Sequence, residues 1–111
     1  MFLSTSHNKI DLKCRVSIPA SFRMNLEKLN EPLILFKSLQ FPCIEGTTFT
    51  RMQRYINAID QLDALSDDAF VLRMMMADSF EIKFDVSGRV VVPDILMNFA
   101  NLTNKAVFMG I

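Results

Sequence analysis

The chain has 111 residues, half of them apolar, with equal numbers of acidic and basic side chains. This length supports one domain with a buried core, and no apolar run approaches the roughly 18 residues that a membrane-spanning helix needs. Zero net charge argues weakly against a general nucleic-acid binder. Two cysteines without CxxC spacing argue against a disulfide framework and fit a reducing cytosol.

One short pattern occurs twice. Residues 9–19 and 83–93 share the frame Lys-apolar-Asp-x-x-x-Arg-Val-x-x-Pro at an offset of 74, without a gap. Continued at this offset, the match reaches Asn30 and Asn104 and then two apolar runs. It gives six identical pairs, where average composition gives about two. The repeat predicts a pseudo-symmetric domain in which each half completes a core that the other cannot close alone.

Each repeat is predicted to begin with two strands joined by a tight polar turn, at 7–11 and 15–18 and again at 79–85 and 89–92. Pro19 and Pro93 end these strands and suit the first position of a short helix. Each helix has an apolar face at spacings of three and four, formed by Phe22, Leu26 and Leu29 and by Ile95, Phe99 and Leu102. Asn30 and Asn104 are predicted to end the helices, because asparagine tolerates a left-handed cap. An apolar strand then follows, at 33–36 and 107–109.

A helical hairpin is predicted between the repeats. After a β-like run at 43–45, apolar residues recur at helical spacing, and a second helix runs from 67 to 76 with Ser66 as its N-cap. Residues 45–79 hold three basic and six acidic side chains, whereas residues 1–40 hold six basic and three acidic ones. The residues expected in the core of the hairpin are Phe49, Met52, Ile56, Ile59, Met74, Met75 and Met76.

These elements divide a single domain into a first repeat at 5–47, a helical connector at 48–78 and a second repeat at 79–111. In the first repeat a further strand begins near Cys43. Its counterpart in the second repeat would begin at residue 117, past Ile111, so we expect the last strand of the second repeat to be missing.

Catalysis finds little support in the residue types. His7 is the one histidine, the chain has three glycines and so no glycine-rich phosphate loop, and no spacing matches a metal site. We therefore expect no enzyme activity, cofactor, metal or small-molecule substrate.

The two polar turns are the better candidate site. Asp11 and Asp85 begin them, where an aspartate can accept hydrogen bonds from the turn backbone. Arg15 and Arg89 then stand at the start of a strand. Arginine presents a planar fork of donors that matches phosphate oxygens or the O6/N7 edge of guanine. The alternative is that each arginine forms a structural salt bridge with its own aspartate, and the residue types favour both equally.

Residues 11–19 and 85–93 resemble the doubled Asp-x-x-Gly-Arg-apolar-x-x-Pro signature of the MraZ family, bacterial transcriptional regulators with two SpoVT/AbrB-type units. The resemblance implies an α+β fold, a pseudo-two-fold swapped-hairpin, AbrB-like and double-psi-like β-barrel. It implies ring-shaped homo-oligomers that bind double-stranded DNA at direct repeats upstream of the cell-division and cell-wall gene cluster. Such a regulator would be cytoplasmic and nucleoid-associated, without a membrane partner.

The resemblance also implies a set of site residues. Those expected to bind DNA are Lys9, Lys13, Arg15, Ser87 and Arg89, and those expected to shape the turns are Asp11, Asp85, Gly88, Pro19 and Pro93. Cys14 stands where the family pattern has glycine. If the turn needs a positive φ, its Cβ costs roughly 1 kcal/mol. The alternative function is an antitoxin-like or other protein-interaction module on the same barrel, marked by a charged or amphipathic tail that wraps a partner.

Overall fold

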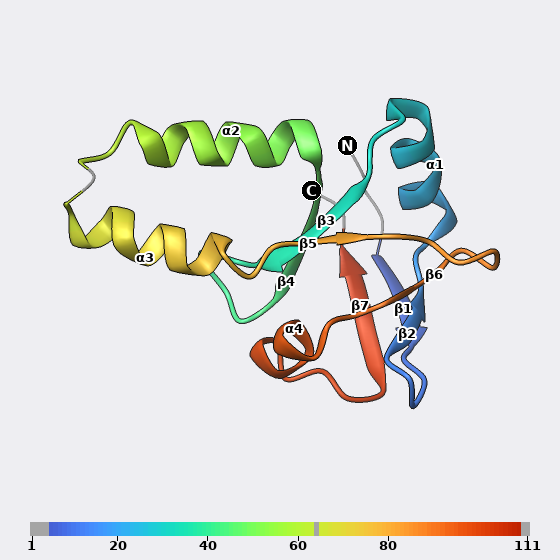
Figure 1. Cartoon of the computed structure of the whole chain (residues 1–111). Helices are drawn as coiled ribbons and strands as arrows, with labels where there is room; N and C mark the ends of the chain where they lie inside the picture. The colour runs from blue at the N-terminus through green and yellow to red at the C-terminus, as the bar shows by residue number, and fades with distance from the viewer. Residues whose placement is uncertain (1–4, 64, 110–111) are drawn as a thin grey trace.

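The computed structural model describes residues 5–63 and 65–109, and Figure 1 shows their arrangement. The elements follow the chain as β1 (Thr5–Lys9), β2 (Arg15–Ser17), α1 (Ala20–Leu29), β3 (Leu33–Lys37), β4 (Ile44–Thr48), α2 (Phe49–Asp60), α3 (Asp67–Met76), β5 (Phe80–Ile82), β6 (Arg89–Val91), α4 (Asp94–Phe99) and β7 (Lys105–Met109). The predicted α+β class is confirmed, including the hairpin of α2 and α3. None of the helices in the described ranges combines the length and apolar character needed to cross a membrane.

Each of the three antiparallel sheets joins strands from both repeats. β1 pairs with β7, β2 pairs with β6, and β3 lies between β4 and β5. The two halves are thus interleaved, and one core serves both. Over the described residues the sheets do not close into a barrel, and β4 and β7 each keep an edge without a partner strand.

The ungapped alignment of the repeats is wrong by one residue in the last strand. Leu35 pairs with Phe80, and Phe108 pairs with Ser6. Because Phe80 and Ser6 are related by the offset of 74, the counterpart of Leu35 is Phe108, at an offset of 73. The second repeat is therefore one residue shorter between its helix and its final strand.

This shortening lies at the end of α4. α1 ends as predicted, with Asn30 in the left-handed conformation (φ 51°). In the second repeat Asn101 takes this role (φ 54°) in place of the predicted Asn104. The N–H of Leu102 donates to the carbonyl of Met97 (2.9 Å), and Leu102 packs against the core that contains Met97. These features form a Schellman motif with its apolar contact. α4 therefore ends before the chain reaches Asn104.

Pro19 and Pro93 directly precede the two helices, with φ of −52° and −58°. The sequence predicts them at the first helical position, but the structure places them at the N-cap, one residue before each helix begins. Proline suits this place because its φ is fixed in this range and it has no N–H to leave unpaired.

The main core lies between the interleaved sheets and the two short helices. A second cluster of Ile34, Phe36 and Met52 forms where α2 and α3 cover the outer face of β3, and Met76 packs against it (Figure 1). β3 is consequently buried on both faces. The buried residues of the main core are Ile10, Val16, Ile18, Leu26, Leu33, Leu35, Ile82, Val90, Val92, Leu96 and Met97.

The predicted apolar faces are correct for only part of their residues. In α4, Ile95 is 48% exposed, and Leu96 and Met97 are buried in its place. A helix of six residues is oriented by the elements around it, since it is too short for a repeating stripe to decide its face. The other predicted core residues that lie exposed are Leu29, Phe49, Ile56 and Met74.

Candidate nucleic-acid interface

The two polar turns have the same hydrogen bonds. Asp11 Oδ1 accepts from the backbone N–H groups of Lys13 and Arg15, both at 2.9 Å. Asp85 Oδ1 accepts from those of Ser87 (2.8 Å) and Arg89 (2.9 Å). In each turn the residue before the arginine also donates to the aspartate carbonyl, at 3.0 Å from Cys14 and 3.1 Å from Gly88. One carboxylate thus fixes the backbone of the whole turn.

These bonds favour the charged form of both aspartates. The pKa of Asp11 lies below its ordinary value, chiefly because the backbone N–H of Arg15 donates to it; burial opposes this, and the Arg15 side chain adds to it. The pKa of Asp85 is lowered likewise, chiefly by the backbone N–H of Arg89. Both carboxylates are therefore ionised at neutral pH, and each aspartate contributes one negative charge to its turn.

Each arginine pairs with its own aspartate and yet stays accessible. Arg15 Nε lies 2.7 Å from Asp11 Oδ2, and Arg89 Nε lies 3.0 Å from Asp85 Oδ2. The arginine side chains remain 33% and 35% exposed. Within the described residues the hydrogen bonds of both guanidinium groups use Nε alone. The salt bridge therefore orients the guanidinium and leaves its Nη groups open to a ligand.

The β2–β6 ladder places the two arginines on one face. Arg15 pairs with Val91, and Arg89 pairs with Ser17. Paired residues of an antiparallel ladder point to the same side, and side chains alternate along each strand. All four therefore share the outer face, while the intervening pair of valines at 16 and 90 is 2% exposed and faces the core. The arginines occupy opposite corners of this face, roughly 7–8 Å apart at their backbones by general sheet geometry.

Each turn is also held by the other repeat. Ile18 N–H donates to the carbonyl of Gly88 (3.3 Å), and Val92 N–H donates to that of Cys14 (2.9 Å). Cys14 and Gly88 both have a positive φ, 59° and 75°. The turn thus requires the conformation that favours glycine, and Cys14 adopts it with a Cβ.

Arg23 of α1 lies against the second turn, a contact that sequence reasoning missed. A Cβ built on Gly88 would be 2.6 Å from Arg23 Nη1, and Arg23 Nε donates to the carbonyl of Ile18 (3.0 Å). The two residues are 65 positions apart and in different repeats, so no local pattern indicates the contact. In the first turn the Cys14 thiol lies 3.9 Å from Asp94 Oδ1 instead.

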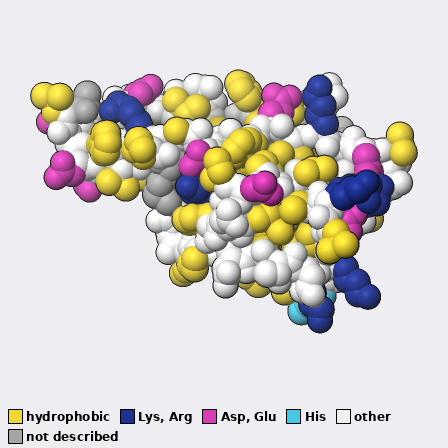
Figure 2. Space-filling model, turned by 60° about the horizontal axis from the view of Figure 1, so that its bottom comes forward, with side chains coloured by type: hydrophobic (Ala, Val, Ile, Leu, Met, Phe, Trp, Pro, Cys, Tyr) yellow, Lys and Arg dark blue, Asp and Glu magenta, His cyan; other side chains and the backbone are white. Residues whose placement is uncertain are grey.

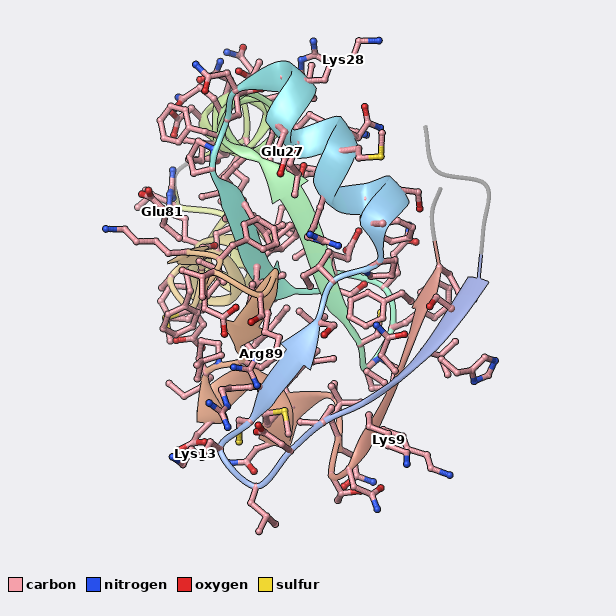
Figure 3. The ribbon with its side chains drawn as sticks, turned by 90° about the vertical axis from the view of Figure 1, so that its right-hand side faces the viewer. Lys9, Lys13, Glu27, Lys28, Glu81 and Arg89 are labelled. Carbon is pink, nitrogen blue, oxygen red and sulfur yellow. The ribbon has the colours of Figure 1, made fainter. Side chains whose placement is uncertain are left out.

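The remaining predicted site residues lie in two places. Lys13 and Ser87 are exposed within the turns. Lys9 ends β1 opposite Lys105, and Figure 3 shows it apart from Lys13 and Arg89. Figure 2 shows Lys and Arg side chains gathered at the end of the molecule away from the helical hairpin, with acidic side chains among them. Lys9 therefore lies on a different strand ladder from Arg15 and Arg89 and does not join them in one cluster.

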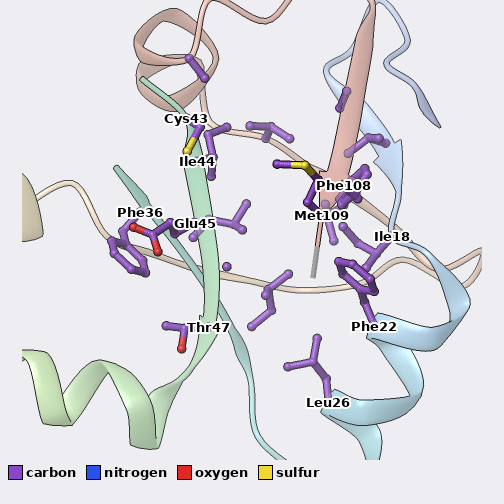
Figure 4. Close-up of a pocket in the computed structure, with 18 of the residues that line it drawn as sticks. Ile18, Phe22, Leu26, Phe36, Cys43, Ile44, Glu45, Thr47, Phe108 and Met109 are labelled. Carbon is purple, nitrogen blue, oxygen red and sulfur yellow. The ribbon is translucent and has the colours of Figure 1, made fainter. Parts of the chain in front are cut away.

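An apolar groove of about 560 Å³ opens between α1, β4 and β7 (Figure 4). Phe22 and Leu26 line it from α1, Ile44 from β4, and Phe108 and Met109 from β7. It contains neither the arginines nor the aspartates of the turns. Among the described residues no group of three His, Cys, Asp or Glu is arranged to hold a metal ion, and His7 lies exposed on β1. The two turns therefore remain the candidate polar site.

Comparison with known proteins agrees with the doubled signature. No protein-family model matches the chain. It is 39% identical to the transcriptional regulator MraZ of Gluconobacter oxydans over 116 residues, which cover all of this chain and 71% of that protein. Identity is 36% to that of Gluconacetobacter diazotrophicus (100% and 73% covered) and 35% to that of Rickettsia akari (99% and 75% covered). The chain belongs to the MraZ family of transcriptional regulators.

Proposed function

We propose that the chain regulates transcription by binding double-stranded DNA through its two Asp-x-x-x-Arg turns. The observation that carries this proposal is the β2–β6 ladder, which holds Arg15 and Arg89 on one exposed face. A pair of guanidinium groups on a rigid strand ladder suits a duplex, which presents phosphates and base edges at regular spacing.

In this mechanism each aspartate positions its arginine. Nε is engaged by the carboxylate, and the Nη pair forms the fork that binds two phosphate oxygens or the O6/N7 edge of guanine. Lys13 and Ser87 contact the phosphate backbone from the tips of the turns. Lys9, on the neighbouring β1–β7 ladder, contacts it at a separate point.

A neutral chain binds DNA strongly only if several copies act together. Zero net charge gives weak affinity from phosphate contacts alone. A ring-shaped homo-oligomer on direct repeats, as the family resemblance implies, raises the effective concentration and strengthens binding on the order of 10²–10⁴-fold. The operator in this proposal lies upstream of the cell-division and cell-wall gene cluster, and the protein works in the cytoplasm at the nucleoid.

The helical hairpin is the surface proposed for this self-association. Phe70 and Met74 lie one turn apart on α3 and are 64% and 58% exposed, and Val71 beside them is 52% exposed. These three residues form an exposed apolar surface on α3, and such a surface commonly marks a contact with another protein chain.

We further propose that the complete fold is a closed swapped-hairpin barrel of two SpoVT/AbrB-type repeats. β3 has a partner strand on both edges, whereas its counterpart β7 pairs on one edge, with β1. By pseudo-symmetry the counterpart of β4 belongs on the open edge of β7, beside the apolar groove. A strand added there would satisfy its backbone groups and cover Phe108 and Met109.

The experiment is a gel-shift titration on a duplex from upstream of this gene cluster, with a scrambled duplex beside it. Arg15→Ala and Arg89→Ala are each expected to abolish the shift while leaving the oligomer mass from light scattering unchanged. Arg54→Ala is the matched control, because Arg54 is an exposed arginine on α2 and is expected to bind normally. Normal binding by both turn variants would reject the proposal.

The apolar groove supports the second candidate function, a protein-interaction module. An open strand edge beside an apolar groove is the arrangement that captures an extended peptide by strand addition. If the chain shifts no duplex but co-purifies in fixed ratio with one protein, and Phe108→Asp releases that protein, this second function holds and the first does not.

A further inference from the structure

Arg23 gives the second turn a cation that its own sequence lacks. The position of Lys13 in the first turn is held by Ser87 in the second. The guanidinium of Arg23 instead reaches this turn from α1 and lies against the backbone of Gly88, directly before Arg89. Each turn thus carries two cationic side chains, although they come from different places in the repeat.

The contact depends on a matched pair of residues. Gly88 leaves open the space that a Cβ would occupy, and Arg23 Nη1, Cζ and Nε all lie within 3.0 Å of that point. In the first turn Cys14 replaces the glycine, and Met97 stands at the position equivalent to Arg23. There the neighbouring charge is the carboxylate of Asp94. The second turn is consequently more positive than the first.

The Arg23 guanidinium is held in place at one nitrogen only. Nε donates to the carbonyl of Ile18 (3.0 Å), and Ile18 N–H in turn donates to the carbonyl of Gly88 (3.3 Å). Within the described residues the Nη groups of Arg23 have no hydrogen-bond partner. A half-buried arginine fixed through Nε presents its remaining donors with little loss of side-chain entropy, which suits an anionic oxygen.

We propose that Arg23 is the second phosphate-binding cation of the Asp85–Arg89 turn and contacts the DNA backbone next to the group bound by Arg89. This inference rests on the proposed DNA-binding function and adds to it a residue outside the repeated motif. It also makes the two turns unequal, because Lys13 lies at the tip of the first turn and Arg23 lies at the base of the second.

The test measures how DNA affinity depends on salt. Arg23→Met copies the residue of the other repeat, and Arg23→Gln removes the charge but keeps a donor toward Ile18. Both are expected to weaken binding to operator and scrambled duplex alike. They should reduce the slope of log affinity against log salt by about 0.9 for each bound subunit, the value for one lost phosphate contact. Lys28→Met, at an exposed site on the same helix, is the control and should leave the slope unchanged.

A rescue variant separates charge from structure. Ser87→Lys in the Arg23→Met background puts a lysine at the second turn where the first has Lys13, and it is expected to restore the slope. If wild-type protein binds DNA but neither Arg23 variant changes the slope, the inference is wrong and the proposed function stands. If wild-type protein shifts no duplex at any salt concentration, the proposed function itself fails. A slope that stays low in the rescue variant would also count against the role of charge.

Discussion

Cys14 and Gly88 occupy the same place in two turns and share a left-handed backbone, with φ of 59° and 75°. The surroundings differ, because the Gly88 site is filled by the guanidinium of Arg23 and Cys14 instead approaches Asp94. Two residue types therefore adopt the same left-handed backbone conformation. Exchanging them separates the free-energy cost of that conformation from the cost of packing a side chain against its neighbour.

Cys14→Gly is expected to stabilise the protein slightly. It removes left-handed strain of about 1–2 kcal/mol, while the added freedom of glycine in the unfolded chain opposes this by about 0.5–1 kcal/mol. The expected net gain in the free energy of unfolding is about 0.5 kcal/mol. Urea unfolding of the variant and the wild type measures it. Cys14→Ala keeps the Cβ and is the control, so a gain of the same size in Cys14→Ala would show that strain is not the cause.

Gly88→Cys is expected to destabilise the protein by about 2–4 kcal/mol, because left-handed strain adds to overpacking against Arg23. Combining it with Arg23→Met should recover about half of the loss, since a flexible methionine replaces the guanidinium. The free energies of unfolding of the four proteins form a double-mutant cycle. Additive losses would contradict the contact between the two positions.

The structures of the turns and of the helical hairpin could be predicted because their signals are local. Asp-x-x-x-Arg fits within one turn. Ser66 caps α3 as expected, because its Oγ accepts from the N–H of Ala69 (3.1 Å). The residue types could not decide whether each arginine forms a salt bridge or stays free to bind a ligand. In the structure each arginine does both, since its Nε pairs with the aspartate and its Nη groups stay open.

Other features depend on contacts between distant segments. Arg23 meets Gly88 across 65 residues, and the shift in β7 follows from where α4 ends. The Asn30–Asn104 match looked like a shared cap, yet Asn101 adopts the left-handed conformation. Sequence identity at a fixed offset cannot detect a helix that stops early and a loop that lengthens to compensate.

Stability is expected to fall in acid because of the two turn aspartates. Their folded pKa values are depressed below the ordinary value of 3.8. A group with a depressed folded pKa stabilises the fold at pH values above its unfolded pKa, and this contribution is lost as pH falls through the folded pKa. Urea unfolding between pH 6 and pH 2 should therefore show a loss that begins near pH 4. Asp11→Asn with Asp85→Asn should flatten that part of the curve, and an unchanged acid slope would mean that other carboxylates govern it.

Charges on the exposed face of α3 are expected to separate the subunits. Phe70→Glu with Met74→Glu places two acidic groups on the apolar surface proposed for self-association, and burying them in an interface is costly. Light scattering should give a lower mass for the double variant, with its circular dichroism unchanged. Its affinity for a duplex with several direct repeats should fall by about 10²–10⁴-fold, while binding to a single repeat stays similar. Met24→Glu is the control, because Met24 is equally exposed but lies on α1; a drop in mass there, or none in the double variant, would move the subunit contact away from the hairpin.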